Sequence, residues 1–202
     1  AVYITTPDGS TYYLAGRVPS TVNSFTHYGV VSGVVPGNLL RGPPPIGHIL
    51  GYYSGCCLIG AGDILWYTNP YAYELVNYSN NYKQFSGWLD IVAPVDDGVY
   101  VSYGSNIGFM RGKSLDKCEL EVLTNYGSTP GTLAYADSIV GVDIPGKKIA
   151  VWSTDNGVVA GFNGGQLVNL SENSYRPGRY KYGAAAILKR DGDNVYVASH
   201  IG

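Results

Sequence analysis

Charged residues are few, and the two signs almost balance. The chain of 202 residues has 13 lysines and arginines against 15 aspartates and glutamates, for a formal net charge of −2. Proteins that bind nucleic acid through its phosphates usually carry a clear basic excess. One stretch, 175–190, interleaves basic and aromatic residues in a pattern that could meet phosphates and bases. We favour a solvated loop there, and the sequence argues against nucleic acid as a partner.

Cysteine is scarce, and long apolar runs are missing. Cys56, Cys57 and Cys118 contain no C-x-x-C pair and do not form the even set of a disulfide-stapled secreted domain. We expect them to be small strand or core residues of a protein made in a reducing compartment, without structural zinc. No apolar run is long enough to span a bilayer, and we see no cleavable signal. We therefore expect no membrane partner.

Recognisable catalytic motifs are missing too. His27, His48 and His200 lack the i, i+4 spacing of a metalloprotease and have no neighbouring cysteine ligand. Ser54 lacks the G-x-S-x-G context of a hydrolase nucleophile. The segment 60–65 begins like a dinucleotide fingerprint but has leucine at the third glycine position and continues as a strand. We interpret these residues as surface, strand or turn positions.

Three carboxylate pairs are the remaining candidates for acid and base chemistry. They are Asp96 with Asp97, Glu119 with Glu121, and Asp191 with Asp193. A glycosidase needs two carboxylates held across a cleft, and none of these pairs has a spacing that predicts one. The first and third pairs fall in equivalent turns, so a repeated structural role is the simpler explanation; calcium at these turns is an alternative. We predict a non-enzymatic protein without catalytic, metal-binding or cofactor-binding residues.

What the chain does contain is a strand-turn-strand pattern in four copies. The second strands lie at 56–59, 98–101, 148–152 and 194–198, each preceded by a turn of Gly, Pro, Asp or Ser. A period of roughly 40 to 50 residues with four short strands is typical of β-propeller blades. The 28 glycines and 11 prolines, with no helical period, predict that helix is scarce.

The two ends of the chain complement each other. The last copy stops after two strands, and the N-terminal segment has the form of a third and fourth strand. Joining them in one blade would remove exposed sheet edges. We predict a single all-β domain over 1–202, a four-bladed β-propeller in which the N- and C-terminal strands close one blade. The predicted blades are 1–18 with 183–202, 47–78, 88–125 and 135–172. A larger propeller or a bent β-array is the alternative.

The segment 20–46 is predicted to be an extended crossing rich in proline and glycine. Its consecutive prolines favour polyproline geometry. A short strand could form near residues 30–31 or 34–35. Tyrosine is unusually frequent, with 19 copies. Its ring buries apolar area while its hydroxyl finds a partner, so we expect about half of the tyrosines at contact surfaces and half between blades.

Several segments together suggest a family. They are 39–47, 60–70, 91–101, 151–157 and 167–172. In their order they resemble β-propeller-like proteins encoded among the virion genes of tailed bacteriophages and prophages. The resemblance covers about 39–200 and implies a virion structural or assembly protein of the neck, tail or a decorating appendage. It also implies virion location after synthesis in the bacterial cytoplasm, other virion proteins as partners, and multiple symmetric copies.

Two further functions are kept as alternatives. A receptor-binding or glycan-binding module on the phage tail would stack aromatic rings on sugars. The positions of Trp66, Trp88 and Trp152 test this hypothesis, because a tryptophan in the core cannot stack on a sugar. A propeller glycosidase ranks last, because no acid pair recurs in a suitable arrangement.

Overall fold

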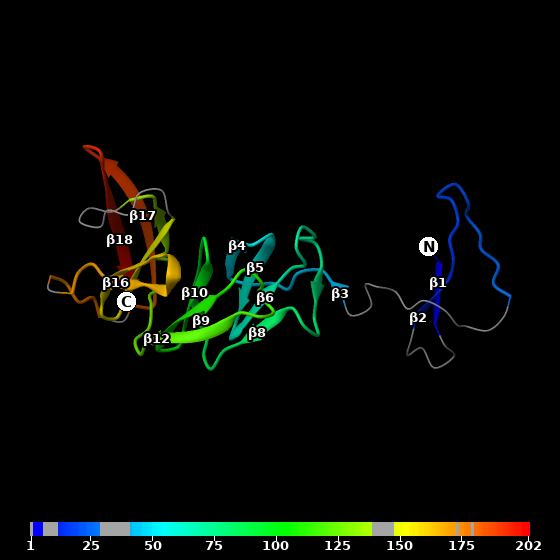
Figure 1. Cartoon of the computed structure of the whole chain (residues 1–202), viewed down its shortest axis with the longest axis horizontal. Coiled ribbons are helices and arrows are strands. Elements are labelled where there is room, and N and C mark those ends of the chain that lie inside the picture. Colours follow the sequence, from blue (N-terminus) through cyan, green and yellow to red (C-terminus); the bar gives the residue numbers. More distant parts are fainter. Residues whose placement is uncertain (1, 6–11, 29–40, 139–147, 173, 179) are drawn as a thin grey trace. The chain divides into compact units, whose positions relative to one another are not determined.

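A computed structural model describes residues 2–5, 12–28, 41–138, 148–172, 174–178 and 180–202. The fold is all-β, as predicted, and the four-stranded sheets are antiparallel (Figure 1). The described residues contain one helical element, the 3₁₀ turn η1 (Asn163–Gly165). The chain divides into two compact units, 1–42 and 43–202. Their organisation as a single domain stays a prediction.

The first unit contains one hairpin. Strand β1 (Val2–Thr5) pairs with β2 (Tyr12–Gly16), as expected for the two N-terminal strands, and the turn predicted between them lies outside the described residues. The ring of Phe25 lies so close to Gly16 that a Cβ there would come within 2.6 Å of it. The short strand β3 (Arg41–Gly42) ends the unit. It is the one strand in the described part of 20–46, and the strands considered at 30–31 and 34–35 lie outside the described residues.

The second unit contains three four-stranded sheets, and in each the spatial order of the strands follows the chain. The first consists of β4 (Ile49–Tyr53), β5 (Cys56–Ala61), β6 (Ile64–Tyr67) and β8 (Tyr82–Gln84). The second consists of β9 (Leu89–Val95), β10 (Gly98–Tyr103), β11 (Asn106–Arg111) and β12 (Glu119–Thr124). The third consists of β13 (Ala134–Ala136), β14 (Ile149–Thr154), β15 (Gly157–Gly161) and β16 (Leu167–Asn169).

The first sheet ends later than its predicted boundary at residue 78. Asn69 and Pro70 were expected to turn the chain directly from the third strand into the fourth. Instead the backbone N–H of Asn69 donates to Leu75 O at 3.0 Å, and that of Tyr71 donates to Gly55 O at 2.8 Å. These bonds build a loop that contains the short strand β7 (Val76–Asn77), so the fourth strand is β8.

Two of the tight turns owe their shape to residues with positive φ. Ser54 (φ 48°) and Gly55 (φ 82°) join β4 to β5, and Asp191 (φ 54°) and Gly192 (φ 93°) join the last two strands. Two-residue hairpin turns of type I′ need positive φ at both positions, because their twist then matches that of the strands. The turn chemistry predicted at these two places is therefore confirmed.

Alternate side chains of the inner strands face different neighbours. In β10, Val99 and Val101 belong to a core shared with the first sheet, whereas Tyr100 belongs to a core shared with the third. In β14, Trp152 joins the core with the second sheet, and Val151 faces the opposite side. The second sheet is therefore buried between the first and the third, and the third is buried between the second sheet and the last hairpin.

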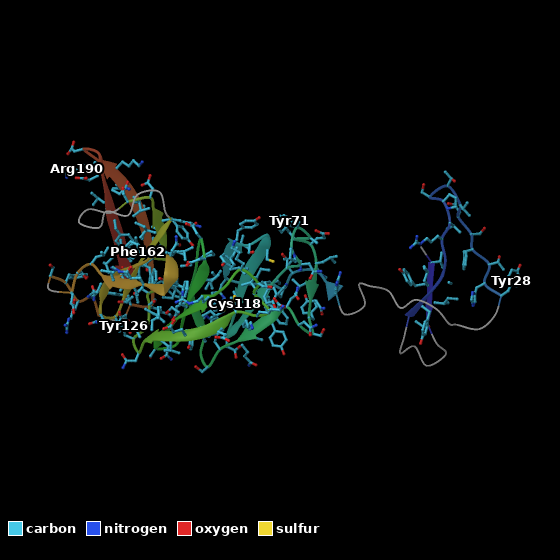
Figure 2. All side chains as sticks on the ribbon, in the orientation of Figure 1. Tyr28, Tyr71, Cys118, Tyr126, Phe162 and Arg190 are labelled. Atoms are coloured by element: carbon cyan, nitrogen blue, oxygen red, sulfur yellow. The ribbon has the colours of Figure 1, made fainter. Side chains whose placement is uncertain are left out.

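The last two strands form a long hairpin. Strand β17 (Tyr182–Arg190) pairs with β18 (Asp193–Ile201) over nine residues, and Arg190 lies at its tip (Figure 2). One face packs on the third sheet: the Tyr196 hydroxyl donates to Thr132 O at 2.8 Å, and the Gly183 N–H donates to Pro130 O at 2.9 Å. The opposite face leaves apolar side chains exposed. They are Leu188, Val195, Val197 and Ile201.

The tip of this hairpin is also tied to the third sheet by a carboxylate. Buried Asn194 donates from Nδ2 to Asp137 Oδ1 at 2.6 Å and to Ser138 O at 2.8 Å. This hydrogen bond, aided by Lys189, lowers the pKa of Asp137. A depressed folded-state pKa contributes stability that is complete above the unfolded pKa and is lost as the pH falls through the folded one.

We therefore expect Asp137→Ala to lower the urea midpoint of unfolding near neutral pH. The difference from the wild type should shrink as the pH falls through the folded pKa of Asp137, because the protonated carboxyl no longer binds Asn194 as a charged acceptor. Urea unfolding at a series of pH values measures this gap. Asp193→Ala is the control, because it removes an exposed carboxylate of the same hairpin and leaves the hydrogen bond between Asn194 and Asp137 in place. A gap for Asp137→Ala that is equal at all pH values would contradict the assignment.

Candidate functional site

A pocket of about 400 Å³ lies where the three sheets of the second unit come together. Its lining comes from the end of β4 and its turn, the end of β9, the turn after β11, and the residue before β14. The lining residues are Tyr52, Tyr53, Ser54, Pro94, Val95, Asp96, Lys113 and Lys148. Its volume lies within the range of roughly 300–1,000 Å³ that is usual for small-molecule sites.

Positive charge predominates in this pocket. Lys113 and Lys148 make no salt bridge with any described residue. The single carboxylate, Asp96, accepts a hydrogen bond from Asn163 Nδ2 at 3.0 Å. Partial burial lowers the pKa of Lys148, against the opposing influence of Asp96. The ammonium group of Lys148 lies 3.9 Å from the centre of the Tyr135 ring, in cation–π geometry.

Two adjacent tyrosines differ in role. Tyr53 is buried, and its hydroxyl donates to Gly112 O at 2.7 Å. Burial, with smaller contributions from Cys118 and Asp97, raises the pKa of Tyr53 to about 12. Tyr52, on the opposite face of β4, is 55% exposed and meets Tyr73 edge to face with ring centroids 6.1 Å apart. Tyr53 therefore fixes the turn before Lys113, while Tyr52 leaves its ring open at the pocket.

A second aromatic feature lies where the neighbouring strands β6 and β8 of the first sheet meet the loop that joins them. The ring of Trp66 is 5.2 Å from that of Tyr78 and 5.3 Å from that of Tyr82, between centroids. Both tyrosines are 40% exposed. We call Trp66, Tyr78 and Tyr82 the aromatic cluster. Tyr71, which has a φ of 58° and is mostly exposed, lies in the loop of the same sheet (Figure 2).

The three histidines have different surroundings. His48 stacks on Trp88 at 5.2 Å, and His200 stacks on Tyr180 at 4.7 Å. His27 is exposed in the first unit. Within the described ranges, no group of three or more His, Cys, Asp or Glu side chains could hold a metal ion. All three cysteines are free, with Cys56 and Cys118 buried and Cys57 half-buried, as expected for strand and core residues.

Of the predicted carboxylate pairs, Asp96 and Asp97 have a clear structural role. Asp97 accepts two hydrogen bonds from the N–H of Gly164, at 2.8 and 3.0 Å, and Asp96 binds Asn163. The pair thus attaches the β9–β10 turn to η1 of the next sheet. Asp191 instead makes an exposed contact of 3.7 Å with Arg190, so the equivalent turns carry different interactions.

The third pair and the basic stretch are at the surface. Glu121 lies 3.5 Å from Arg111 in an exposed ion pair, and Glu119 is exposed. In the basic stretch, the described basic side chains are also exposed. They are Arg176, Lys181, Lys189 and Arg190, and Arg179 lies outside the described residues.

The three tryptophans occupy different environments. Trp152 is fully buried and donates from Nε1 to Ser128 Oγ at 2.9 Å. Trp66 is half-buried in the aromatic cluster, and Trp88 is 64% exposed. The three tryptophans therefore give a mixed answer on glycan binding: Trp152 lies in the core, whereas Trp66 and Trp88 are accessible. The sequence did not predict the pocket lysines as site residues, because Lys113 and Lys148 are far apart in the chain and match no motif.

Comparison with known proteins finds no matching family model and no matching curated protein. Among the described residues, no helix has the length and apolar character needed to cross a membrane.

Proposed function

We propose that the chain is a non-enzymatic structural protein of a tailed-phage virion, in the neck, tail or a decorating appendage. The observation that supports it most is the burial of the second and third sheets on both faces. Leu58 of the first sheet and Val101 of the second share one core, while Tyr100 and Trp152 share the next. Such packing makes a rigid scaffold whose loops remain available for subunit contacts. Together with the resemblance to virion proteins, it favours an assembly role with multiple symmetric copies.

The scaffold is proposed to be a closed four-bladed propeller. Three sheets have the four-stranded meander of a blade, while β1–β2 and β17–β18 each form a two-stranded sheet. No closed ring is detected among the described strands. In the proposed closure, the N-terminal hairpin supplies the third and fourth strands of the last blade, and β18 gains a partner on its free edge.

Hydrogen exchange tests this closure directly. Amide protons of β18 that point away from β17 should exchange slowly in the full chain and rapidly after residues 1–42 are removed. Protons that bond to β17 should stay protected in both, which provides an internal control. Rapid exchange of the outward protons in the full chain would rule out closure by pairing.

The virion assignment is tested on purified, intact particles. Mass spectrometry should detect the polypeptide at a fixed ratio to the other structural proteins. Cryo-electron microscopy should place it in a symmetric ring at the neck or tail, or on the capsid surface. Particles that assemble fully without the polypeptide would contradict the proposal.

A second candidate function, binding of glycans on the host surface, is favoured by the aromatic cluster. Tyrosine and tryptophan rings present flat apolar faces with polar edges, which suits contact with sugars. Binding there should change tryptophan fluorescence, and the change should be lost in Trp66→Phe but retained in Trp152→Phe, since Trp152 is fully buried. A panel of host-surface polysaccharides that leaves the fluorescence unchanged would argue against this function.

A further inference from the structure

Two lysines are among the residues that line the pocket between the sheets. Lys113 comes from the turn after β11 of the second sheet, and Lys148 comes from the third sheet. Neither forms a salt bridge with the described residues, in a protein whose net charge is negative. Two lysines that line one hollow and form no salt bridge with the described residues favour the binding of an anion there.

The geometry of the turns holds this charge in place. Tyr53 binds Gly112 O next to Lys113. Asp96 is attached to Asn163, and Lys148 rests on the Tyr135 ring. The anion would therefore meet side chains whose neighbours are already ordered, which lowers the entropy cost of binding.

The remaining walls suit a sugar rather than a bare anion. Tyr52 offers an exposed ring supported edge to face by Tyr73, and aromatic faces pack well against the C–H faces of pyranose rings. Ser54 carries a hydroxyl and Asp96 a carboxylate, so both can hydrogen-bond sugar hydroxyls. The volume of about 400 Å³ exceeds that needed by a small inorganic anion and is sufficient for a monosaccharide.

We propose that this pocket binds a saccharide that carries a carboxylate, such as a terminal uronic acid. The carboxylate lies between Lys113 and Lys148, the sugar ring lies against Tyr52, and Asp96 accepts hydroxyl hydrogen bonds. The proposal extends the glycan-binding function from the aromatic cluster to a second site, the pocket, and names the ligand class of that site. It is independent of where the chain sits in a virion.

The test uses two probes that differ by the carboxylate alone. Isothermal titration calorimetry with the purified full chain should show binding of methyl β-D-glucuronide and at least tenfold weaker binding of methyl β-D-glucoside. Lys113→Ala and Lys148→Ala should each weaken glucuronide binding about tenfold, as expected when one hydrogen bond to a charged group is lost. Lys117→Ala is the matched control, since it removes an exposed lysine of the same loop that does not line the pocket.

Other measurements separate the possible failures. Equal affinities for the two glycosides, or an unchanged affinity in both pocket variants, would overturn the proposal. Competition by inorganic phosphate as strong as that by the glucuronide would show a general anion site and would overturn the saccharide assignment. Circular dichroism of each variant confirms that it is folded. If glucuronide binding fails while the fluorescence change at Trp66 persists, the pocket proposal alone is lost; if both fail, glycan binding itself is lost.

Discussion

Replacing Trp152 with alanine is expected to destabilise the second unit by about 3–5 kcal/mol. Its ring is fully buried between the second and third sheets, 5.6 Å from that of Tyr100. The substitution leaves a large cavity in this core and removes the donor to the buried Ser128 hydroxyl. Because a domain of this size is stable by only about 5–15 kcal/mol, the loss is a large part of the total.

Urea unfolding followed by circular dichroism measures this effect. Trp88→Ala is the matched control: its side chain is 64% exposed, so its removal should cost far less. Equal shifts of the unfolding midpoint in the two variants would show that the second and third sheets do not share the core described here.

Substituting Gly131 by alanine should detach the last hairpin from the third sheet. Gly131 has a φ of 81°, and a Cβ there would lie 2.2 Å from Gly183 O in β17. The left-handed conformation alone costs an L-residue about 1–2 kcal/mol, and the overlap with a backbone oxygen adds about 1–3 kcal/mol. The hydrogen bond from Gly183 N–H to Pro130 O, formed by the adjacent residue, should break as the strand moves away.

Hydrogen exchange at Gly183 reports this detachment, together with the urea midpoint. Gly192 offers a close comparison, because its φ is 93° but a Cβ there would meet nothing within 4 Å. Gly192→Ala should therefore show the cost of backbone strain without the overlap. Slow exchange at Gly183 in Gly131→Ala, equal to that in the wild type, would contradict the docking contact.

The strands were predictable because their signals are local. Val99, Tyr100 and Val101 follow a turn of two aspartates and a glycine, and both their β-propensity and the turn chemistry indicate one strand. The first sheet's end was misplaced because Asn69–Pro70 is equally good turn chemistry for a loop. Backbone hydrogen bonds such as that from Asn69 to Leu75 decide between a tight turn and a loop, and residue types do not predict them.

The pocket was not predictable for a different reason. Tyr52, Lys113 and Lys148 belong to different sheets, and only the packing of those sheets brings them together. Their spacing in sequence depends on loop lengths rather than on chemistry. A lysine in a polar turn is ordinarily a solvated residue, and nothing adjacent in the chain distinguishes Lys113 from its neighbour Lys117.

The attachment of Asp96 and Asp97 to η1 has a consequence for synthesis on the ribosome. Their partners Asn163 and Gly164 lie 67 residues later in the chain. At about 5–20 residues per second, translation leaves several seconds before those partners emerge. Throughout that interval the nascent turn ends in two carboxylates that water solvates well. The turn of Asp96 and Asp97 is therefore well solvated until Asn163 and Gly164 are synthesised, and it does not attract other nascent chains in the meantime.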